Sequence, residues 1–282
     1  MQVESSESEA GDEAAAAAPF VKWAGGKRST IHELGRRLPA EFGQYYEPFA
    51  GGAALFFHLR KRLATARLSD TNLELVLAYN AVKKNPHELI DLLEQHAREH
   101  SSTHYYAMRA LHGMDDAVER AARFLYLNKT CYNGLYRVNL RGEFNVPLGK
   151  YLNPNIVARD NILASSSALQ VAEIKLLDFR QVAPSPGDFV YFDPPYHPAD
   201  QSSFTKYTKL NFTEKDQVEL CELALRLHRQ GVQVMLSNSD TEFIRHLYRG
   251  RAFRIATVEA PRFVNCKPDG RSAVRELLIT NY

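Results

Sequence analysis

The segment GDFVYFDPPYHP, residues 187–198, places an acid, two prolines and a tyrosine directly after an apolar run. The letters VYF are typical of a buried strand, so Asp193 is expected at the carboxyl end of a strand, where open α/β sheets hold their ligands. Pro194 and Pro195 cannot donate to a sheet ladder, so they end the strand. The carbonyl of Asp193 or Pro194 is then free to accept a hydrogen bond, and Tyr196 adds an aromatic face.

Two fixed acceptors beside a ring suit an amino group on a flat heterocycle. Such an amine is a poor nucleophile because its lone pair is delocalised into the ring. Hydrogen bonds to Asp193 and to the Pro194 carbonyl favour a more tetrahedral nitrogen whose lone pair points at an electrophile, and this chemistry needs no metal. The alternative is that Asp-Pro-Pro is a turn that ends a strand and that Tyr196 only packs.

A second constellation lies near the start of the chain. The segment QYYEPFAGGAALFFHLRKRL reads as a short strand, a Gly-Gly turn and a helix, which is how nucleotide-binding α/β folds begin. The next predicted strand, ATARLSD, ends at Asp70. Asp70 follows Gly51 by 19 positions, close to the spacing of about 20 at which an acid reaches a ribose hydroxyl in such folds.

Strands and helices alternate along most of the chain, which predicts an α/β fold. Five further segments have strand character: VAEIKLLDF, GDFVYFD, VQVMLSNSD, FRIATVEAP and VRELLITNY. Thr213 and Asp216 form a capping box ahead of an amphipathic helix that ends near Gly231. Residues 73–158 interrupt this pattern with helical, His- and Tyr-rich sequence and a stretch rich in Gly, Asn and Pro. We therefore expect a catalytic domain of residues 19–72 and 159–282 with an inserted domain of residues 73–158.

The charge is unevenly distributed. Residues 1–18 hold five acids and no Lys or Arg, and since the formal net charge is +2 the remainder carries 2 + 5 = +7. That excess is compatible with a polyanionic partner. We interpret residues 1–18 as a disordered tail. The chain has no signal-peptide pattern and no apolar run long enough to span a membrane, so a cytoplasmic protein is expected.

Neither cysteine nor histidine spacing indicates a metal site. Cys131, Cys221 and Cys266 are far apart and form no C-x-x-C pair. His96, His100 and His104 have a spacing of four, which could align three imidazoles on one helix face as ligands. Their polar neighbours favour a solvated helix face instead.

Five motifs in a fixed order carry a resemblance to a known family. They are FVKWAGGKR, YYEPFAGGAALFF, LSDTN, NKTCYNGLYRVNLRGEFNVPLGKY and FDPPY. In this order they resemble the Dam-like DNA adenine methyltransferases, the alpha-ordered group of S-adenosylmethionine-dependent amino methyltransferases. The likeness extends from Pro19 to Tyr282. It implies a Rossmann-like methyltransferase domain with a mostly parallel sheet, plus an inserted, mainly helical DNA-recognition domain with a β-hairpin.

The resemblance also assigns the cofactor site. It implies that Trp23 and Lys27 help to hold S-adenosylmethionine, and that Asp70 binds the ribose hydroxyls. The turn that would lie against the methionine part of the cofactor consists of Glu47, Pro48, Phe49 and Gly51. Asp193 belongs to both sites, since Asp193 to Tyr196 would bind the target adenine beside the sulfonium. Ala53 stands where the family has the last glycine of its F-x-G-x-G motif.

The stretch from residue 121 to 150 has five basic residues and one acid, and we expect it to contact double-stranded DNA. Arg123, Lys129, Arg137, Arg141 and Lys150 are candidates for phosphates or base edges. Asn133 and Arg137 can pair with adenine and guanine. The stretch resembles the recognition hairpin of family members that methylate GATC, which implies DNA contacts for Tyr132, Asn133, Leu135, Arg137 and Pro147. We add Asn139 and Arg141, and Lys206 and Lys209 in the later segment SSFTKYTKLNF.

The predicted reaction is methyl transfer to the N6 amine of an adenine flipped out of the duplex, in which Tyr196 stacks on the base. Cytosine or a protein glutamine are alternative acceptors, and a DNA-binding regulator without turnover is an alternative of another class. The glutamine enzymes usually carry Asn at the position of Asp193. We expect a monomer. The sequence leaves open whether a cognate restriction endonuclease acts on the same site.

Overall fold

The computed structural model describes residues 16–198, 212–260 and 274–282, and within them every predicted strand is present. The strands are β1 (Tyr45–Glu47), β2 (Ala66–Asp70), β3 (Ala172–Leu176), β4 (Phe189–Phe192), β5 (Gln233–Ser239), β6 (Arg254–Ala260) and β7 (Val274–Thr280). They form one sheet in the order β3-β2-β1-β4-β5-β7-β6. Strands β1 to β6 of this sheet run in one direction and β7 runs in the opposite direction between β5 and β6, so the expected mostly parallel, Rossmann-like sheet is confirmed.

The strand order changes direction between β1 and β4. From β1 the chain builds outward through β2 and β3, and it then returns to place β4 on the other side of β1. In open α/β sheets, ligands bind at the carboxyl ends of the strands at such a switch point. Here β1 ends at Glu47 and Asp193 directly follows β4.

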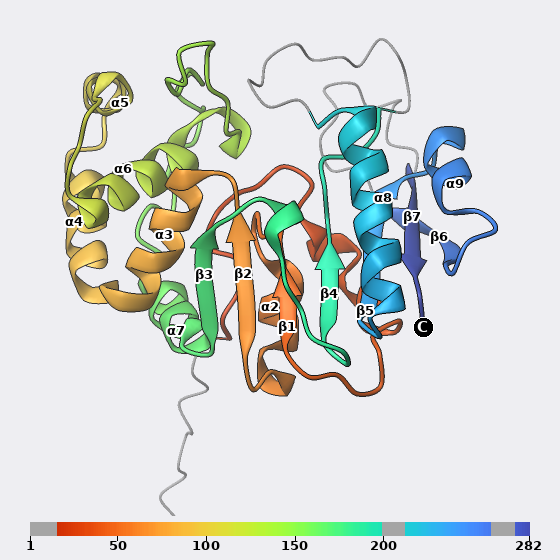
Figure 1. The fold of residues 1–282 in the computed structure, drawn as a ribbon. Helices are drawn as coiled ribbons and strands as arrows, with labels where there is room; N and C mark the ends of the chain where they lie inside the picture. Colours follow the sequence, from red (N-terminus) through yellow and green to blue (C-terminus); the bar gives the residue numbers. More distant parts are fainter. Residues whose placement is uncertain (1–15, 199–211, 261–273) are drawn as a thin grey trace, which may run out of the picture.

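Helices cover both faces of the sheet (Figure 1). In the described part of the chain they are α1 (Ile31–Gly35), α2 (Ala54–Leu59), α3 (Leu73–Lys84), α4 (Pro86–Arg98), α5 (Ser102–Ala110), α6 (Ala117–Thr130), α7 (Arg159–Leu169), α8 (Glu214–Arg229) and α9 (Glu242–Tyr248), with short 3-10 helices η1 (Lys27–Ser29), η2 (Arg60–Arg62), η3 (Tyr132–Gly134) and η4 (Phe179–Gln181). One buried core lies between the sheet and α2, α3 and α7, and the other between the sheet and α8 and α9.

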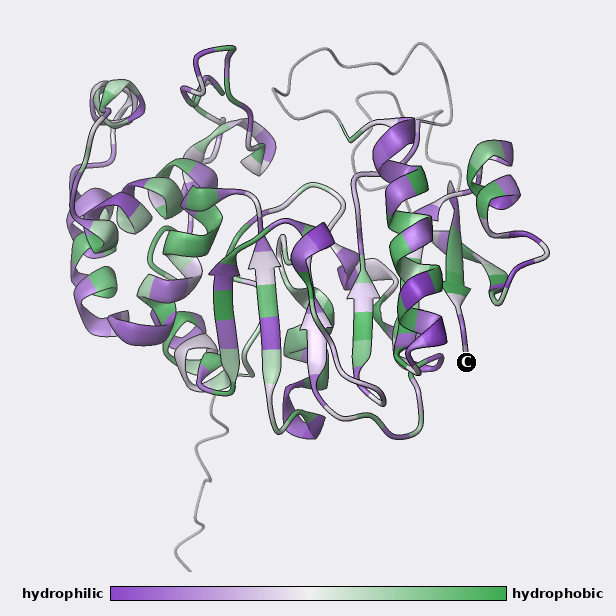
Figure 2. Ribbon diagram, viewed as in Figure 1, coloured by the Kyte–Doolittle hydropathy of each residue, from purple (hydrophilic) through white to green (hydrophobic). Residues whose placement is uncertain are grey.

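Strand β4 lies inside the sheet and is buried on both of its faces. Its four residues are all buried: Phe189 and Tyr191 face the first core, and Val190 and Phe192 face the second. A strand that is apolar on both faces must lie inside a two-sided sheet. Helix α8 differs from β4, because Figure 2 shows both hydrophobic and hydrophilic residues along it, as expected for a helix that covers one face of the sheet.

The predicted capping box at the start of α8 is confirmed. The Thr213 side chain accepts a hydrogen bond from the Asp216 backbone, and the Asp216 side chain accepts one from the Thr213 backbone. The helix ends at Arg229, and Gly231 takes a φ of +76° shortly after it. A positive φ is favourable for glycine and strained for other residues, so Gly231 is a natural stop.

The insertion is mainly helical and carries the expected hairpin, above α3 and α6 in Figure 1. Isolated antiparallel bridges join Cys131 to Leu148 and Val138 to Phe144. Helices α4, α5 and α6 bury side chains in the same core that α3 forms with the sheet. The insertion is therefore packed continuously against the α/β body, and its division at residues 73 and 158 remains a prediction.

The start of the described chain is tied to the body. The Ala18 backbone N–H donates to the Asn161 side chain, and its carbonyl accepts from Asn161 and Ser165. Residues 1–15 of the expected tail lie outside the described residues. Within the described ranges, no helix combines the length and hydropathy needed to cross a bilayer.

The expectation that His96, His100 and His104 share one helix face is wrong. Helix α4 ends at Arg98 and α5 begins at Ser102, so the three imidazoles come from two helices and their connection. They surround Tyr126 of α6 instead of facing solvent: His96 Nδ1 lies 3.0 Å from His104 Nε2, and His100 Nδ1 lies 2.9 Å from the Tyr126 hydroxyl. Burial lowers the pKa of His96 to about 4.

Candidate functional site

The carboxyl edge of the sheet collects acids from several strands. Glu47 ends β1, Asp70 ends β2 and Asp193 follows β4. Strand β7 runs the other way, so it begins at this edge, where Glu276 pairs with Ser239 at the end of β5. The topology thus brings residues that are far apart in the sequence to one place.

Asp193 lies at the centre of this edge beside Lys27. The Lys27 Nζ atom is 2.9 Å from Asp193 Oδ1, and the two side chains are only 6% and 17% exposed. The contact is an ion pair in which Oδ1 receives no well-aligned hydrogen bond from the described residues. That buried oxygen can therefore accept a further hydrogen bond from a ligand.

Tyr196 completes the cluster. Its hydroxyl donates to Glu276 Oε2 over 2.9 Å, which anchors the ring to β7. The Lys27 ammonium lies 4.7 Å from the centre of the same ring, within the range of a cation–π contact. No donor among the described residues reaches the Pro194 carbonyl, which is the second acceptor expected from the sequence.

The charges in this cluster oppose one another. Burial raises the pKa of Asp193, and the Lys27 ammonium works against that rise. Burial also raises the pKa of Tyr196 well above its ordinary value. Glu47 is completely enclosed, and burial raises its pKa to about 8 although it accepts hydrogen bonds from the Tyr45 hydroxyl and the Phe56 backbone. Lys27 is therefore the cation that offsets the buried acids at this edge.

Polar side chains from α8 and β5 hold the loop that follows Asp193. Gln217 donates to the Pro195 carbonyl over 2.9 Å and accepts from Asn238 over 2.9 Å. Asn238 in turn accepts from the His197 backbone N–H, and Ser239 donates to the His197 carbonyl. Buried polar groups bonded to each other in this way fix a backbone conformation.

These supporting residues were missed by the sequence reasoning. Gln217 lies on the apolar stripe of α8 with Leu220, Cys221 and Ala224, so a polar residue at a core-facing helix position was a usable signal. Glu276 gave no local signal, because its role depends on where β7 pairs. The contact between Lys27 and Asp193 likewise requires the tertiary fold.

The turn after β1 has the geometry of a tight ligand-binding turn. Gly51 has a φ of +47°, and a Cβ atom there would be 2.7 Å from Trp23 Cδ1. Its N–H donates to Asp70 Oδ2 over 3.1 Å, and its carbonyl accepts from the Tyr79 hydroxyl. Trp23, Gly51 and Asp70 are thus brought together as the sequence predicts. Ala53 also has a positive φ, +49°, so the residue that replaces the family's glycine is strained.

The other residues expected at this turn lie around it. Pro48 is buried, and Phe49 is half-buried with its ring stacked on Phe179 at 5.2 Å between centroids. Asp70 is half-buried, and burial raises the pKa of its carboxyl while backbone N–H groups, including that of Asn72, oppose the rise.

The hairpin presents part of the expected DNA-contacting set. Tyr132, Asn133, Leu135, Arg141 and Pro147 are exposed, and the Tyr132 N–H donates to the Pro147 carbonyl. Arg137 and Asn139 are half-buried: Arg137 donates to the Asn145 side chain and Asn139 to Glu143. Lys206 and Lys209 lie outside the described residues.

Two of the residues suggested as phosphate contacts are half-buried, and their DNA contacts remain predictions. The Arg123 guanidinium donates to the backbone carbonyls of Met108 and Arg109, so it ties α6 to α5. Lys129 is half-buried, and burial lowers its pKa to about 8. Lys150 remains exposed.

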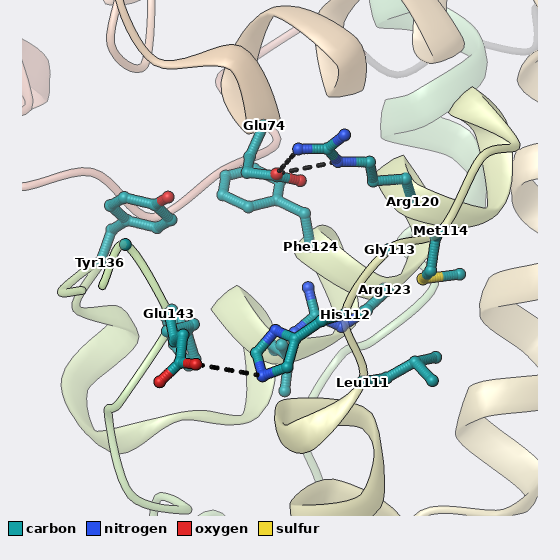
Figure 3. A pocket seen from close by; sticks show the side chains of 13 residues that line it. Glu74, Leu111, His112, Gly113, Met114, Arg120, Arg123, Phe124, Tyr136 and Glu143 are labelled. Atoms are coloured by element: carbon teal, nitrogen blue, oxygen red, sulfur yellow. Dashed lines mark hydrogen bonds and ion pairs between the residues drawn. The ribbon is translucent and has the colours of Figure 1, made fainter. Parts of the chain in front are cut away.

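A cavity of about 180 Å³ lies in the insertion, away from Asp193. Figure 3 shows it between the hairpin residues Tyr136 and Glu143 and the helix residues Arg120, Arg123 and Phe124. Glu74 and Arg120 form an ion pair at its wall. Neither here nor elsewhere in the described ranges do three or more His, Cys, Asp or Glu side chains gather as metal ligands.

The sequence was compared with those of known proteins, and the matches extend over most of the chain. Residues 23–263 match the family model of the D12 class N6 adenine-specific DNA methyltransferases. The chain is 41% identical to the Type II methyltransferase M1.LlaDCHI of Lactococcus lactis subsp. cremoris, over 94% of this chain and 95% of that one. It is 42% identical to the Type II methyltransferase M.MjaIII of Methanocaldococcus jannaschii, over 94% and 99%. It is 34% identical to a DNA adenine methylase of Vibrio cholerae, over 92% and 94%.

Proposed function

Since the chain belongs to the D12 class of N6 adenine-specific DNA methyltransferases, we propose that it methylates adenine within GATC sites of duplex DNA, at the edge formed by Asp193, Pro194 and Tyr196. S-adenosylmethionine supplies the methyl group. Because the chain belongs to this class, we take adenine in DNA as the acceptor in place of cytosine or a protein glutamine. For the same reason we take the protein as an enzyme and not as a regulator without turnover.

The observation that carries the assignment of the site is the buried Asp193 carboxylate. Its Oδ1 atom has a cation 2.9 Å away and no well-aligned donor among the described residues. An exocyclic amine that donates one proton to Asp193 and the other to the Pro194 carbonyl would have its lone pair directed away from both. Fixed acceptors of this kind lower the barrier because they need no reorganisation during the reaction.

Lys27 and Tyr196 have supporting roles in this proposal. Lys27 keeps Asp193 ionised, so that its oxygens accept hydrogen bonds. Tyr196 offers a ring, anchored through Glu276, on which an extrahelical adenine can stack. The amine becomes acidic once it is methylated, so Asp193 need not be a strong base and the proton passes to water.

The residues that we propose to bind the cofactor form or border the turn after β1. Gly51, Asp70 and Trp23 form a close-packed cradle in which a side chain at Gly51 would collide with the indole. Lys27, Glu47, Pro48 and Phe49 border it, which supports the methionine part lying beside Asp193 and the ribose beside Asp70.

The hairpin is proposed to read the site. Tyr132, Asn133, Leu135 and Pro147 project from it, and Arg137 is held at its base by Asn145. Amide and guanidinium groups in this arrangement can pair with the adenine and guanine edges of GATC. We further propose that the enzyme acts as a monomer in the cytoplasm, and an endonuclease acting on the same site remains a prediction.

Mapping of methylated bases tests this proposal. Purified protein is incubated with S-adenosylmethionine and plasmid DNA from a host without methylation, and modified adenines are mapped by long-read sequencing. We expect N6-methyladenine in GATC only. Methylation at another motif would refute the proposed role of the hairpin while leaving the chemistry intact, and unmodified DNA would refute the proposal as a whole.

A further inference from the structure

Tyr136 belongs to the hairpin, but its side chain points inward. It stands between Leu135 and Arg137, two residues proposed to contact DNA, and it is half-buried where Leu135 is exposed. Its ring stacks on Trp23 with centroids 5.5 Å apart and an interplanar angle of 26°. It also contacts Phe124 of α6 edge to face and Phe144 of the hairpin in a tilted arrangement.

Trp23 joins this stack to the cofactor turn. The indole lies so close to Gly51 that a Cβ atom there would be 2.7 Å away. The N–H of Gly51 is in turn bonded to Asp70. Tyr136 therefore lies one aromatic contact away from the residues proposed to bind the methionine and ribose parts of the cofactor.

Tyr136 also borders a cavity. Its ring is one of the side chains that line the cavity of about 180 Å³, together with Phe124 and Phe144, and Figure 3 shows Tyr136 at its wall. A side chain next to such a void can shift at lower cost than one in a filled core. The hairpin can therefore move together with Tyr136. A ligand that fixes the indole of Trp23 would then also fix the hairpin.

We propose that Tyr136 is a positioning residue that couples cofactor occupancy to DNA recognition. A cofactor bound against Gly51 fixes the indole of Trp23, the stack fixes Tyr136, and Leu135 and Arg137 are then held in their DNA-reading positions. This inference rests on the proposed cofactor and DNA sites. A stacked aromatic pair corresponds to a factor of roughly 2 to 12 in an equilibrium constant, which sets the expected size of the coupling.

A second contact keeps the hairpin attached when Tyr136 is changed. Asn128 of α6 accepts from the Lys22 backbone N–H and donates to the carbonyls of Lys22 and Gly134. Variants of Tyr136 should thus lose the stack without releasing the base of the hairpin. This makes the coupling separable from folding.

The test compares DNA binding with and without S-adenosylhomocysteine. Dissociation constants are measured for a fluorescent duplex that holds the site methylated by the wild-type enzyme, using wild type, Tyr136→Leu and Tyr136→Phe. We expect S-adenosylhomocysteine to tighten DNA binding by wild type and Tyr136→Phe, which keeps the ring. In Tyr136→Leu the tightening should shrink by roughly 2- to 12-fold, in line with one lost stack.

Coupling must be reciprocal, so DNA should tighten S-adenosylhomocysteine binding by the same factor in each protein. If Tyr136 had only a structural role, Tyr136→Leu would weaken the binding of both DNA and S-adenosylhomocysteine. The factor by which each ligand tightens the binding of the other would then stay as in wild type. Unchanged coupling in a folded Tyr136→Leu protein, or no coupling in wild type, would overturn the inference. Because the duplex carries whichever site the wild type methylates, failure of the GATC assignment is detected separately.

Discussion

At the scale of single residues, the proposed catalysis depends on one carboxylate held ionised where burial disfavours charge. Burial raises the pKa of Asp193, the nearby Glu276 adds to that rise, and the Lys27 ammonium opposes it. Both Lys27 and Asp193 stand out in the sequence, since one ends a Gly-Gly-Lys loop and the other opens Asp-Pro-Pro-Tyr. Their contact does not stand out, because 165 intervening residues separate them and only the switch point of the sheet brings them together.

Replacing Lys27 should change the pH dependence of catalysis. In Lys27→Gln, Asp193 stays buried without its cation, so its pKa rises further. Because activity is lost as pH falls through that pKa, the acid limb of the rate should move to higher pH. At a fixed pH on that limb, the rate should fall roughly tenfold for each pH unit by which the limb moves.

Single-turnover methylation at saturating cofactor and DNA, followed across pH, measures this effect. Lys27→Arg keeps the positive charge and should keep the acid limb near that of wild type. Coincident acid limbs for Lys27→Gln and wild type would show that Lys27 does not set the charge of Asp193.

Glu47 should make stability fall as pH rises. Its pKa in the folded protein is about 8, above the ordinary 4.5, so the fold holds a proton that the unfolded chain releases. Stability from this group is complete below about 4.5 and is lost as pH rises toward about 8, with a slope of at most about 1.4 kcal/mol per pH unit.

Urea unfolding of Glu47→Gln without cofactor tests this linkage. The variant should gain stability relative to wild type as pH rises through this window and stop gaining above it. The exposed Glu222→Gln change serves as a control for loss of an acid at the surface. A pH-independent difference between Glu47→Gln and wild type would contradict the prediction.

At the scale of elements, the turn between β1 and α2 provides a matched pair of glycines. Gly51 has a φ of +47° and no room for a Cβ atom beside Trp23, whereas a Cβ atom at Gly52 would have its nearest contacts at 3.8 Å. Gly51→Ala should displace the indole and weaken cofactor binding by more than about tenfold, an effect of about 1.4 kcal/mol. Gly52→Ala should change it by less than about threefold.

Isothermal titration with S-adenosylhomocysteine measures both variants, with thermal unfolding as a check on folding. Equal effects of the two substitutions would show that the close approach of Trp23 to Gly51 does not shape the cofactor site.

The loop after β4 depends on α8 and β5. In Gln217→Glu the side chain keeps its size but cannot donate to the Pro195 carbonyl, which would be left unpaired at a cost of about 1–3 kcal/mol. The methyl-transfer rate constant should fall by at least about tenfold, while cofactor affinity, which we propose is set mainly by the turn after β1, should change little.

The measurement is a single-turnover rate constant beside a cofactor dissociation constant. The conservative change Gln230→Glu, just beyond the end of the same helix, is the control. A Gln217→Glu variant with a normal rate constant would mean that this hydrogen bond does not position Pro194 and Tyr196.

The elements were largely predictable because each has a local signal. The strands are apolar runs, α8 has a capping box and Gly231, and the turn at Gly51 has its glycines. Prediction failed where the outcome depended on packing between elements. His96 and His104 fit one helix by spacing but were separated by the break before Ser101, whose side chain caps α5. The partial burial of Arg123 and Lys129 likewise depends on how α6 packs, and a count of charges along the sequence does not reveal it.

At the scale of the whole molecule, the proposed sites of chemistry and of DNA recognition lie in one continuously packed body. The insertion shares its core with the sheet, and the hairpin stands beside the carboxyl edge where Asp193 lies. The residues after the first 18 carry a formal net charge of +7, which suits a negatively charged DNA partner. Sequence patterns predicted the mostly parallel sheet and the helical insertion with its hairpin, but they did not reveal the core that the two share. The supporting role of Glu276 depended on the antiparallel placement of β7.

The most direct test of the central claim is the rate of methyl transfer when Asp193 is replaced by asparagine, which has nearly the same shape and no charge. Single-turnover methylation of a duplex is measured at saturating S-adenosylmethionine, with dissociation constants for cofactor and DNA. We predict a rate constant lower by at least about a thousandfold, or about 4 kcal/mol, with both ligands still bound. A rate constant within about tenfold of wild type would contradict the assignment of Asp193 to the reacting amine.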